Sequence, residues 1–244
     1  MDSGTAIVTG AGKRVGAHLA RALIADGWRV VAHVHHREDE VPKGAVKVVA
    51  DLADVESAET IFAAAEGPVR LLVNNAARFA LDGFGAVSPD EFDAHMAVNV
   101  RAPALLIDRL ARAHERGSDA LVVNLLDSKI DAPNADYLSY TLSKQALAGL
   151  TDLAARALAP LGIRVNAIAP GLMLRSSGQS AENFAAMHSN NPLGRGVEAD
   201  DVADALRYLI GASCMTGQTL TIDSGHRFLA LDRDVQFLGK EGQR

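Results

Sequence analysis

Seven short runs of apolar and β-branched residues recur along the chain, and most are separated from the next by a longer segment with helical periodicity. The runs span 5–9, 29–34, 45–50, 70–75, 120–126, 163–169 and 218–223. Strands that alternate with helices need crossover connections, which place helices on both faces of a parallel sheet. The pattern therefore predicts an α/β fold, doubly wound, with a seven-stranded parallel sheet.

Local signals predict where three of the helices lie. In the letters "SPDEF", Ser88 is an N-cap residue, Pro89 stands at the first helical position and Glu91 follows three residues after the cap. This combination is typical of a helix N-terminus, so a long helix should begin there. Residues 139–158 and 198–210 have the periodicity of two further helices.

Two other segments, a long connection and the C-terminal tail, are candidate parts of the substrate site or of a subunit interface. Residues 172–191 are rich in Ser, Gly and Asn and are long for a connection, so we expect a lid over the substrate. For the tail at 226–244, two interpretations stay open. It either reaches into the pocket of a neighbouring subunit or seals a dimer interface.

Composition limits the classes of partner. The chain has 244 residues, of which 48% are hydrophobic, and this suits a single domain over 1–244. A formal net charge of −6, with only short basic clusters, argues against binding to nucleic acid or to a membrane surface. No apolar run approaches the roughly 18 residues of a membrane span. We expect a small-molecule partner.

A single cysteine, Cys214, leaves no internal disulfide. This favours a reduced compartment, and the first residues show no basic region followed by an apolar stretch, so we expect a cytoplasmic protein. Cys214 itself is expected to be a small buried side chain.

The first predicted strand runs directly into the letters "TGAGKRVG", with glycines at Gly10, Gly12 and Gly16 before an apolar helical pattern. Glycines let the backbone approach a diphosphate and leave amide groups and a helix N-terminus directed at it. An ordinary tight turn is the alternative. The position between the first strand and the first helix favours a dinucleotide site in a Rossmann-like fold.

The end of the second predicted strand favours one type of dinucleotide. A fold that binds NAD usually carries an acid here, roughly 20 residues after the glycines, for the ribose hydroxyls. This chain has His35, His36 and Arg37 instead, which can surround a 2'-phosphate with donors. NADPH/NADP is therefore the predicted cofactor. A solvated loop is the alternative, and a metal site has no second ligand cluster to support it.

Tyr140 and Lys144 lie four residues apart in "YTLSK", on one face of a predicted helix. An ammonium beside a phenol favours the phenolate, which should lower the pKa of Tyr140 from its reference of about 10 toward neutrality. Such a tyrosine is a usable proton donor or acceptor.

With these motifs in place, the sequence resembles the classical short-chain dehydrogenase/reductase family over essentially its whole length. The matching letters are "TGAGKRVG", "DL" at 51–52, "NNAA" at 74–77, "VNVRAP", "YTLSK" and "PG" at 170–171. The resemblance implies that Tyr140 is the acid, that Lys144 holds the nicotinamide ribose and that Asn99 supports a proton-relay water. It also implies a homotetramer.

A set of residues is expected to bind the cofactor, either from its place after the strands or from the resemblance. The set consists of Gly10, Gly12, Arg14, Val15, Gly16, His35, His36, Arg37, Asp51, Leu52, Asn75, Ala76, Ala77, Lys144, Pro170 and Gly171.

Two positions depart from the usual pattern of the family. Arg14 stands where a glycine is usual, and Asp127, in "NLLDSK", stands where a serine is usual, thirteen residues before the tyrosine. Both departures are similar to the pteridine reductases and dihydromonapterin reductases, and Phe79 in "NNAARF" looks like the same branch. If the substrate is a pterin, we expect Phe79 to stack on one of its faces while nicotinamide covers the other, and Arg14 to bridge cofactor phosphate and substrate.

The aspartate argues against ordinary ketone reduction. An ionised carboxylate has no donor for a carbonyl oxygen, and leaving that pair unsatisfied costs on the order of 1–3 kcal/mol. Reduction of a C=N bond instead demands a proton on ring nitrogen. The hypothesis is that NADPH reduces a dihydropterin to its tetrahydro form, with Tyr140 and Asp127 in the proton relay.

Several alternatives remain from the sequence. Asp127 could cap a turn while Ser128 takes the role of the serine, Phe79 could be a core residue, and Arg14 could bind phosphate alone. The alternative functions are a generic NADP-dependent carbonyl reductase of the 3-oxoacyl type and a catalytically silent NADP-binding module.

Overall fold

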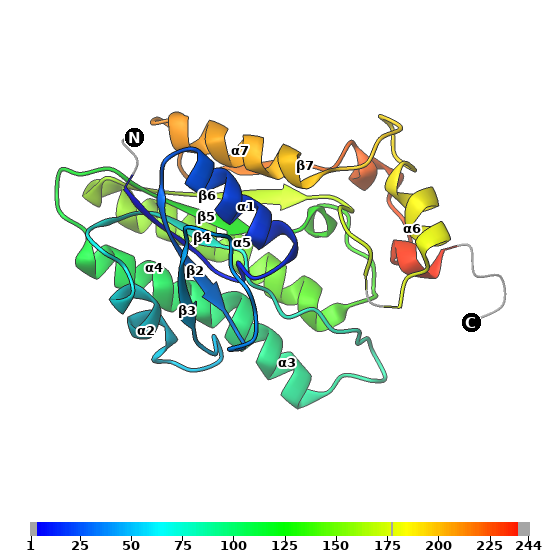
Figure 1. Ribbon diagram of the computed structural model, residues 1–244. Helices are drawn as coiled ribbons and strands as arrows, with labels where there is room; N and C mark the ends of the chain where they lie inside the picture. The colour runs from blue at the N-terminus through cyan, green and yellow to red at the C-terminus, as the bar shows by residue number, and fades with distance from the viewer. Residues whose placement is uncertain (1–3, 177, 239–244) are drawn as a thin grey trace.

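A computed structural model describes residues 4–176 and 178–238 of the chain, and its centre is a parallel sheet of seven strands. The strand order is β3-β2-β1-β4-β5-β6-β7, and every neighbouring pair is parallel (Figure 1). The strands are β1 Thr5–Val8, β2 Arg29–Val34, β3 Val46–Val49, β4 Val69–Asn74, β5 Ala120–Leu125, β6 Ile163–Pro170 and β7 Thr219–Ile222. The predicted fold class is confirmed.

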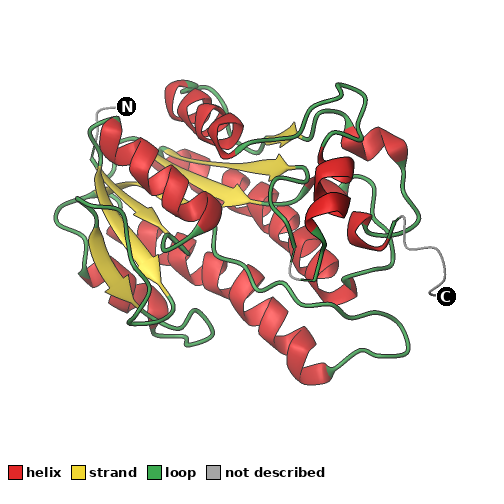
Figure 2. Ribbon diagram, turned by 45° about the vertical axis from the view of Figure 1, so that its right-hand side comes forward, coloured by secondary structure: helices red, strands yellow, loops and turns green. Residues whose placement is uncertain are grey.

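Helices cover both faces of this sheet (Figure 2). Because side chains alternate along a strand, Ala6 and Val8 of β1 pack in the core that includes α1 and α7, whereas Ile7 packs in the core that includes α2, α4 and α5. The helices are α1 Arg14–Ala25, α2 Ser57–Ala63, α3 Pro89–Met96, α4 Ala102–Ala113, α5 Leu138–Leu158, α6 Ala181–His188 and α7 Ala199–Gly211.

The order of the strands creates a crevice. The chain proceeds outward from β1 through β2 to β3, then returns so that β4 lies on the other side of β1. At such a switch point the connections leave in opposite directions, and the crevice at the carboxyl ends of the strands is where ligands bind in this class of fold.

The predicted helix starts agree with the structure. The hydroxyl of Ser88 accepts a hydrogen bond from the Glu91 N–H at 3.4 Å, and Pro89 is the first residue of α3. A π-helix, Ala97–Arg101, then joins α3 to α4, so the segment is long and continuous. The two other predicted helices correspond to α5 and α7.

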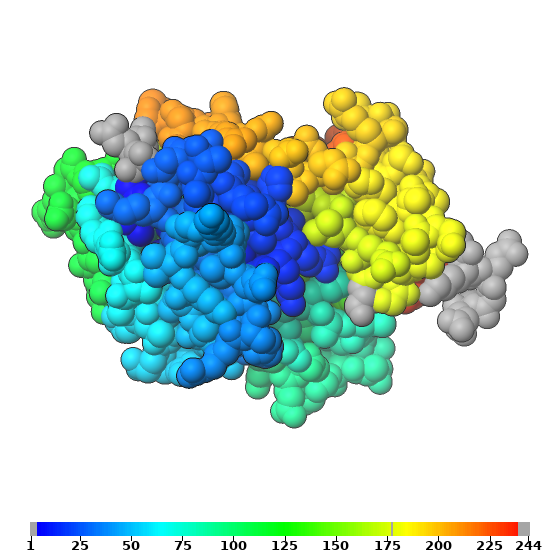
Figure 3. Space-filling model, viewed as in Figure 1, coloured from blue at the N-terminus to red at the C-terminus, as the bar shows by residue number. Residues whose placement is uncertain are grey.

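The segment 172–191 contains a helix that its periodicity did not predict. In α6, the hydroxyl of Ser180 caps the N-terminus by accepting from the Asn183 N–H at 3.1 Å. None of the residues of α6, all of them described, is buried, so the helix has no apolar stripe to reveal it. The segment forms a protruding surface, yellow in Figure 3. Residue 177 lies outside the described residues.

One prediction about burial is wrong. Cys214 is exposed, because it lies in the turn between α7 and β7 rather than on a core-facing element. Within the described ranges, no helix is both long enough and apolar enough to cross a lipid bilayer.

Candidate active site

A cavity with a volume of about 720 Å³ opens at the carboxyl edge of the sheet. Its walls come from the glycine-rich loop, from the residues that follow β2, β4, β5 and β6, and from the C-terminal segment after β7. Most of the residues predicted to bind cofactor or substrate, or to take part in catalysis, line this one space. The exceptions are Arg37 and Asn99.

The glycine-rich loop has no room for side chains at two positions. A Cβ atom on Gly16 would lie 2.2 Å from the carbonyl oxygen of Gly10, and Gly10 itself has a φ of +66°. The side-chain amide of Asn75 donates to the carbonyls of Thr9 at 2.8 Å and Gly10 at 3.2 Å. The loop is therefore held close against the end of β4, with its backbone open to the cavity, as a diphosphate-binding turn requires.

His33 supports the loop from β2, a role that was not among the predicted ones. Its Nδ1 accepts a hydrogen bond from the Gly10 N–H at 3.2 Å, so its Nε2 carries the hydrogen and donates to the Ala50 carbonyl at 3.0 Å. Burial lowers the pKa of His33, which keeps the imidazole neutral and this pattern of donor and acceptor intact. A histidine within an otherwise apolar strand was the available signal.

Arg14 adopts a backbone conformation that favours glycine. It is the first residue of α1, with a φ of +53°, and its side chain lines the cavity. A left-handed backbone costs a residue with a Cβ about 1 kcal/mol. Its Nη2 donates to the Arg175 carbonyl at 3.5 Å, so the guanidinium connects the glycine-rich loop with the segment 172–191.

The residues after β2 and β3 are brought together only in part. The rings of His35 and His36 lie 4.1 Å apart between centroids, and His35 Nε2 lies 3.9 Å from a carboxylate oxygen of Asp51. These three residues line the cavity. Arg37 does not line it, and its carbonyl accepts a hydrogen bond from Lys47. Its predicted contribution to the 2'-phosphate site therefore has no support in this arrangement.

The remaining cofactor-side residues all border the cavity. Leu52, Ala76 and Ala77 follow β3 and β4, while Pro170 ends β6 and Gly171 comes directly after it. At Gly171 a Cβ atom would lie 2.9 Å from Asp223, so the backbone passes too close to β7 for any other residue.

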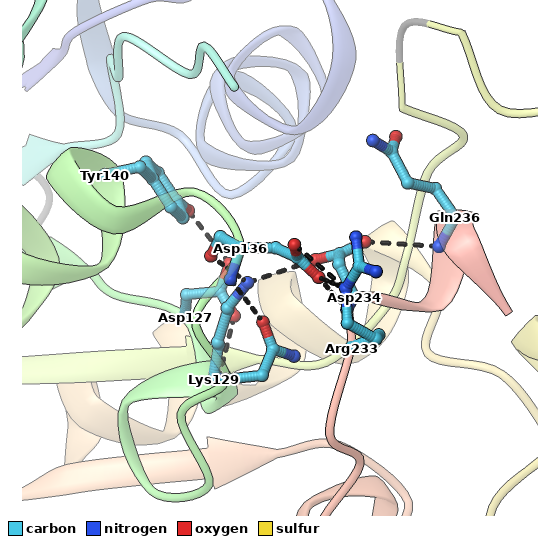
Figure 4. A network of polar contacts seen from close by, with 8 residues as sticks. Asp127, Lys129, Asp136, Tyr140, Arg233, Asp234 and Gln236 are labelled. Atoms are coloured by element: carbon cyan, nitrogen blue, oxygen red, sulfur yellow. Dashed lines mark hydrogen bonds and ion pairs between the residues drawn. The ribbon is translucent and has the colours of Figure 1, made fainter. Parts of the chain in front are cut away.

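Tyr140 and Asp127 are in direct contact. The Tyr140 hydroxyl donates to one carboxylate oxygen of Asp127 at 2.8 Å, and the other oxygen accepts the Lys129 N–H at 2.9 Å (Figure 4). Asp127 therefore caps a turn and also faces the tyrosine. Ser128, also at the cavity wall, is buried at the start of a short 3₁₀ helix, so the aspartate is the residue that meets the phenol.

Lys144 lies one turn further along α5. Its Nζ donates to the Leu125 carbonyl at 2.6 Å and lies 5.7 Å from the centre of the Tyr140 ring. Burial lowers the pKa of Lys144 to about 8, and the charge of Asp127 opposes this shift.

The prediction of an acidified phenol is not met in the structure. Burial, followed by the negative charge of Asp127, raises the pKa of Tyr140 well above its ordinary value. Burial also raises the pKa of Asp127, against the effects of the Lys129 and Tyr140 hydrogen bonds. The carboxylate is nearer to the phenol than the ammonium is, so the phenol keeps its proton. Asp127 in turn is a weaker acid than an ordinary aspartic acid side chain.

Phe79 is part of an aromatic wall and not of the core. It is 45% exposed, which excludes core packing. Its ring stacks on Tyr137 at 4.3 Å and meets the edge of Tyr140 at 4.7 Å. Tyr137, in the left-handed conformation at the N-cap of α5, stacks in turn near Phe237 of the C-terminal segment at 6.5 Å.

Asn99 is placed beside the site without lining it. It lies in the π-helix, where its side-chain oxygen accepts from the Arg78 N–H at 2.7 Å. Its amide donates to the Arg78 carbonyl at 3.0 Å and the Ser143 hydroxyl at 2.9 Å. These contacts occupy the side chain, and they join the strand end that carries Phe79 to the helix that carries Tyr140.

The family profile described as enoyl-(acyl carrier protein) reductase matches residues 10–227 of this chain. The chain belongs to the short-chain dehydrogenase/reductase family. The predicted family and the prediction of an oxidoreductase that uses a nicotinamide cofactor are thereby confirmed.

Among curated relatives, L-xylulose reductase of Bos taurus is 37% identical over 92% of this chain and 96% of its own length. Pteridine reductase 1 of Leishmania tarentolae is 31% identical over 91% and 95%. A solved structure, FolM alternative dihydrofolate reductase 1 from Brucella canis complexed with NADP, is similar with a TM-score of 0.85 and 34% identity. It covers 93% of this chain and 94% of that one. The relatives therefore include both pterin or folate reductases and a sugar reductase.

Proposed function

We propose that this enzyme uses NADPH to reduce the C=N bond of a dihydropterin and produces the tetrahydro form. The observation that carries the proposal is the hydrogen bond from the Tyr140 hydroxyl to the Asp127 carboxyl at 2.8 Å. A carboxyl group at this position suits a substrate that needs a proton on nitrogen. The similarity to pteridine reductase 1 and to a FolM dihydrofolate reductase supports the same substrate class.

The cavity suits a dinucleotide that carries a 2'-phosphate. Gly10 and Gly16 give the loop its close approach, and His35 and His36 supply donors where an acid would serve NAD. The similar Brucella canis structure is a complex with NADP. When bound, NADPH supplies the hydride. We assign Lys144 to holding the cofactor ribose and Arg14 to bridging phosphate and substrate.

The protein's own residues supply the proton. Burial raises the pKa of Asp127, which increases the fraction of carboxyl that carries a proton near neutral pH. The Tyr140 hydroxyl orients this carboxyl and shares its proton. As hydride reaches the substrate carbon, the relay gives one proton to the adjacent nitrogen, and solvent then restores it. Phe79, half-exposed at the cavity wall, gives a planar ring a surface on which to stack.

Reduction of a ketone is the second candidate. The L-xylulose reductases, 35–37% identical over at least 90% of this chain, favour it. In that reaction the Tyr140 hydroxyl would donate to the substrate oxygen, and an ionised Asp127 would oppose the developing negative charge. The chemistry of Asp127 therefore favours the pterin over the ketone.

The test compares substrates and one variant. NADPH oxidation is measured with dihydromonapterin, dihydrobiopterin, L-xylulose and an acetoacetyl thioester, for the wild type and Asp127→Ser. We expect pterin turnover that collapses in the variant. Ketone or thioester turnover that survives the change would establish a carbonyl reductase, and NADPH binding without any turnover would establish a silent binding module.

We further propose that the enzyme is a homotetramer, as the family resemblance implies, and that it works in the cytoplasm, as its single cysteine favours. Light scattering on the purified chain tests the assembly. A monomer mass would refute it.

A further inference from the structure

The C-terminal segment that follows β7 lies on the chain's own cavity. His226, Ala230, Leu231, Arg233, Asp234 and Val235 all line it, together with Asp127 and Phe79. Two 3₁₀ turns, His226–Leu229 and Val235–Phe237, shape this segment. Of the two interpretations left open for the tail, neither predicted that its described part would form a wall of the site in the same subunit.

The segment is fastened to the turn that carries Asp127. Lys129 Nζ donates to a carboxylate oxygen of Asp234 at 3.2 Å and to the Asp136 carbonyl at 2.8 Å. The carboxylate of Asp136 accepts the Asp234 N–H at 2.7 Å and pairs with Arg233 at 2.8 Å. Figure 4 shows these side chains converging from the turn after β5 and from the C-terminal segment. Lys129 and Asp234 are only 12% and 17% exposed, which makes this pair less screened than a surface ion pair.

His226 has a polar atom without a partner. Its Nε2 is buried and makes no hydrogen bond within the described part of the chain, although the residue lines the cavity. Its backbone is fixed, because the buried carboxylate of Asp223 accepts the N–H groups of Gly225 at 3.0 Å and Arg227 at 2.9 Å. A buried nitrogen without a partner is costly in a fixed turn, unless a ligand or water completes it.

The charges around the imidazole are mostly negative. Burial lowers the pKa of His226, while the negative charges of Asp223, Asp127 and Asp234 oppose that shift. The cations of the same wall are already paired, Arg227 with Asp223 at 2.7 Å and Lys129 with Asp234. The wall therefore offers a carboxylate acceptor and an imidazole nitrogen to a ligand.

We propose that His226 and Asp234 form the substrate-recognition wall and bind the nitrogen-rich edge of an amino-substituted heterocycle. This inference rests on the proposed function. The Asp234 carboxylate accepts from ring N–H or amino groups, and His226 completes its hydrogen bonding with a neighbouring ring oxygen or nitrogen. A polyhydroxylated ketone has no such pair of N–H donors, so this wall distinguishes the two substrate classes that the relatives represent.

Steady-state kinetics of NADPH oxidation test the wall with dihydrobiopterin and L-xylulose as probes. The variants are Asp234→Asn, His226→Phe, His226→Gln and the matched control Asp232→Asn, which changes an exposed neighbour. Loss of a hydrogen bond to a charged group predicts a KM for dihydrobiopterin that rises roughly 10-fold to 100-fold in Asp234→Asn. We expect a similar rise in His226→Phe, and recovery in His226→Gln, whose amide nitrogen takes the place of Nε2.

The other readouts separate recognition from folding. We expect kcat for dihydrobiopterin to change less than KM, NADPH affinity to stay at the wild-type value, and Asp232→Asn to behave as wild type. Dihydrobiopterin turnover with an unchanged KM in Asp234→Asn and His226→Phe overturns the recognition wall and leaves the proposed function standing. A wild-type enzyme that turns over L-xylulose and no dihydropterin overturns the proposed function and, with it, the wall.

Discussion

Replacing Asp127 with asparagine separates the acid from the shape of the side chain. In the structure, one carboxylate oxygen accepts the Lys129 N–H at 2.9 Å and the other accepts the Tyr140 hydroxyl at 2.8 Å. Asparagine keeps an oxygen for the Lys129 N–H. Its amide nitrogen can donate to the Tyr140 oxygen, since a hydroxyl both donates and accepts. We therefore expect the free energy of unfolding of Asp127→Asn to stay within about 1 kcal/mol of the wild type.

The catalytic effect should be far larger. Asparagine has no ionisable proton, and a positioned general acid contributes about 10²-fold to 10⁴-fold to the rate. This range corresponds to about 3–5 kcal/mol of activation free energy. We expect kcat for dihydrobiopterin to fall by that factor in Asp127→Asn, while NADPH binding, followed by nicotinamide fluorescence, remains at the wild-type value.

The pH profile gives the same prediction a second readout. Burial raises the pKa of Asp127, and the protonated carboxyl is the donor, so wild-type kcat should decrease as pH rises through that pKa. The variant has no such group, and its residual rate should lack this decrease. A variant with kcat within a factor of about three of the wild type would refute the acid role, because that loss is below any general-acid contribution. So would a decrease with pH that persists unchanged.

Three further changes test the glycine-rich loop and two charged residues of the site, Lys144 and Arg14. In Gly16→Ala the new Cβ would lie 2.2 Å from the Gly10 carbonyl oxygen, so we expect NADPH affinity, measured by calorimetry, to fall by at least about tenfold. An affinity equal to that of the wild type would contradict the role of the glycine-rich loop in binding the cofactor. For Lys144, whose folded pKa is lowered to about 8 from 10.5, the unfolded chain binds more protons between these two values. The contribution of Lys144 to the free energy of unfolding therefore rises with pH across that window. Urea titrations should show a smaller rise in Lys144→Met than in the wild type, and an equal rise in both proteins would contradict the lowered pKa. In Arg14→Gly the left-handed φ of +53° is relieved, so we expect its unfolding free energy to exceed that of Arg14→Ala by about 0.5–1 kcal/mol. Equal thermal denaturation of these two variants would argue against strain at this position.

The sheet and the loop were predictable because their signals are local. The central strands β1, β5 and β6 are buried along their whole length, which requires short runs of β-branched and apolar residues such as those at 120–126. A Cβ atom at Gly16 would meet the carbonyl of Gly10, six residues earlier, and the spacing of these glycines is visible in the letters. The Tyr140 and Lys144 pair follows from helical spacing alone.

Other features depend on contacts that the spacing of residues does not reveal. The ion pair between Lys129 and Asp234 joins positions 105 residues apart, so nothing local indicated that the C-terminal segment would line the cavity. The support of Gly10 by His33 arises only because β1 and β2 are paired in parallel. The helix α6 has no buried face, so it produced no amphipathic pattern.

The direction of the Tyr140 shift illustrates the same limit and bears on the reaction. From spacing, the lysine was expected to acidify the phenol, but the buried carboxyl of Asp127 lies at 2.8 Å and dominates. The charge of Asp127 acts in the same sense on its two neighbours, because it raises the pKa of the phenol and also that of the Lys144 ammonium. Protonation of Asp127 thus makes Tyr140 the stronger acid and Lys144 the weaker base, so the three groups titrate as one coupled unit.

Within this unit, the carboxyl should be the first group to give up a proton. Its pKa is raised, but it starts from 3.8, whereas the pKa of Tyr140 is raised from 10.0. A serine in place of Asp127 would leave the phenol as the nearest acid. With the aspartate, the phenol acts mainly as the group that orients the carboxyl and passes its proton on. Under the proposed function, the exchange of serine for aspartate therefore changes which atom supplies the proton, and this is why Asp127→Ser should lose pterin turnover even though Tyr140 and Lys144 stay in place.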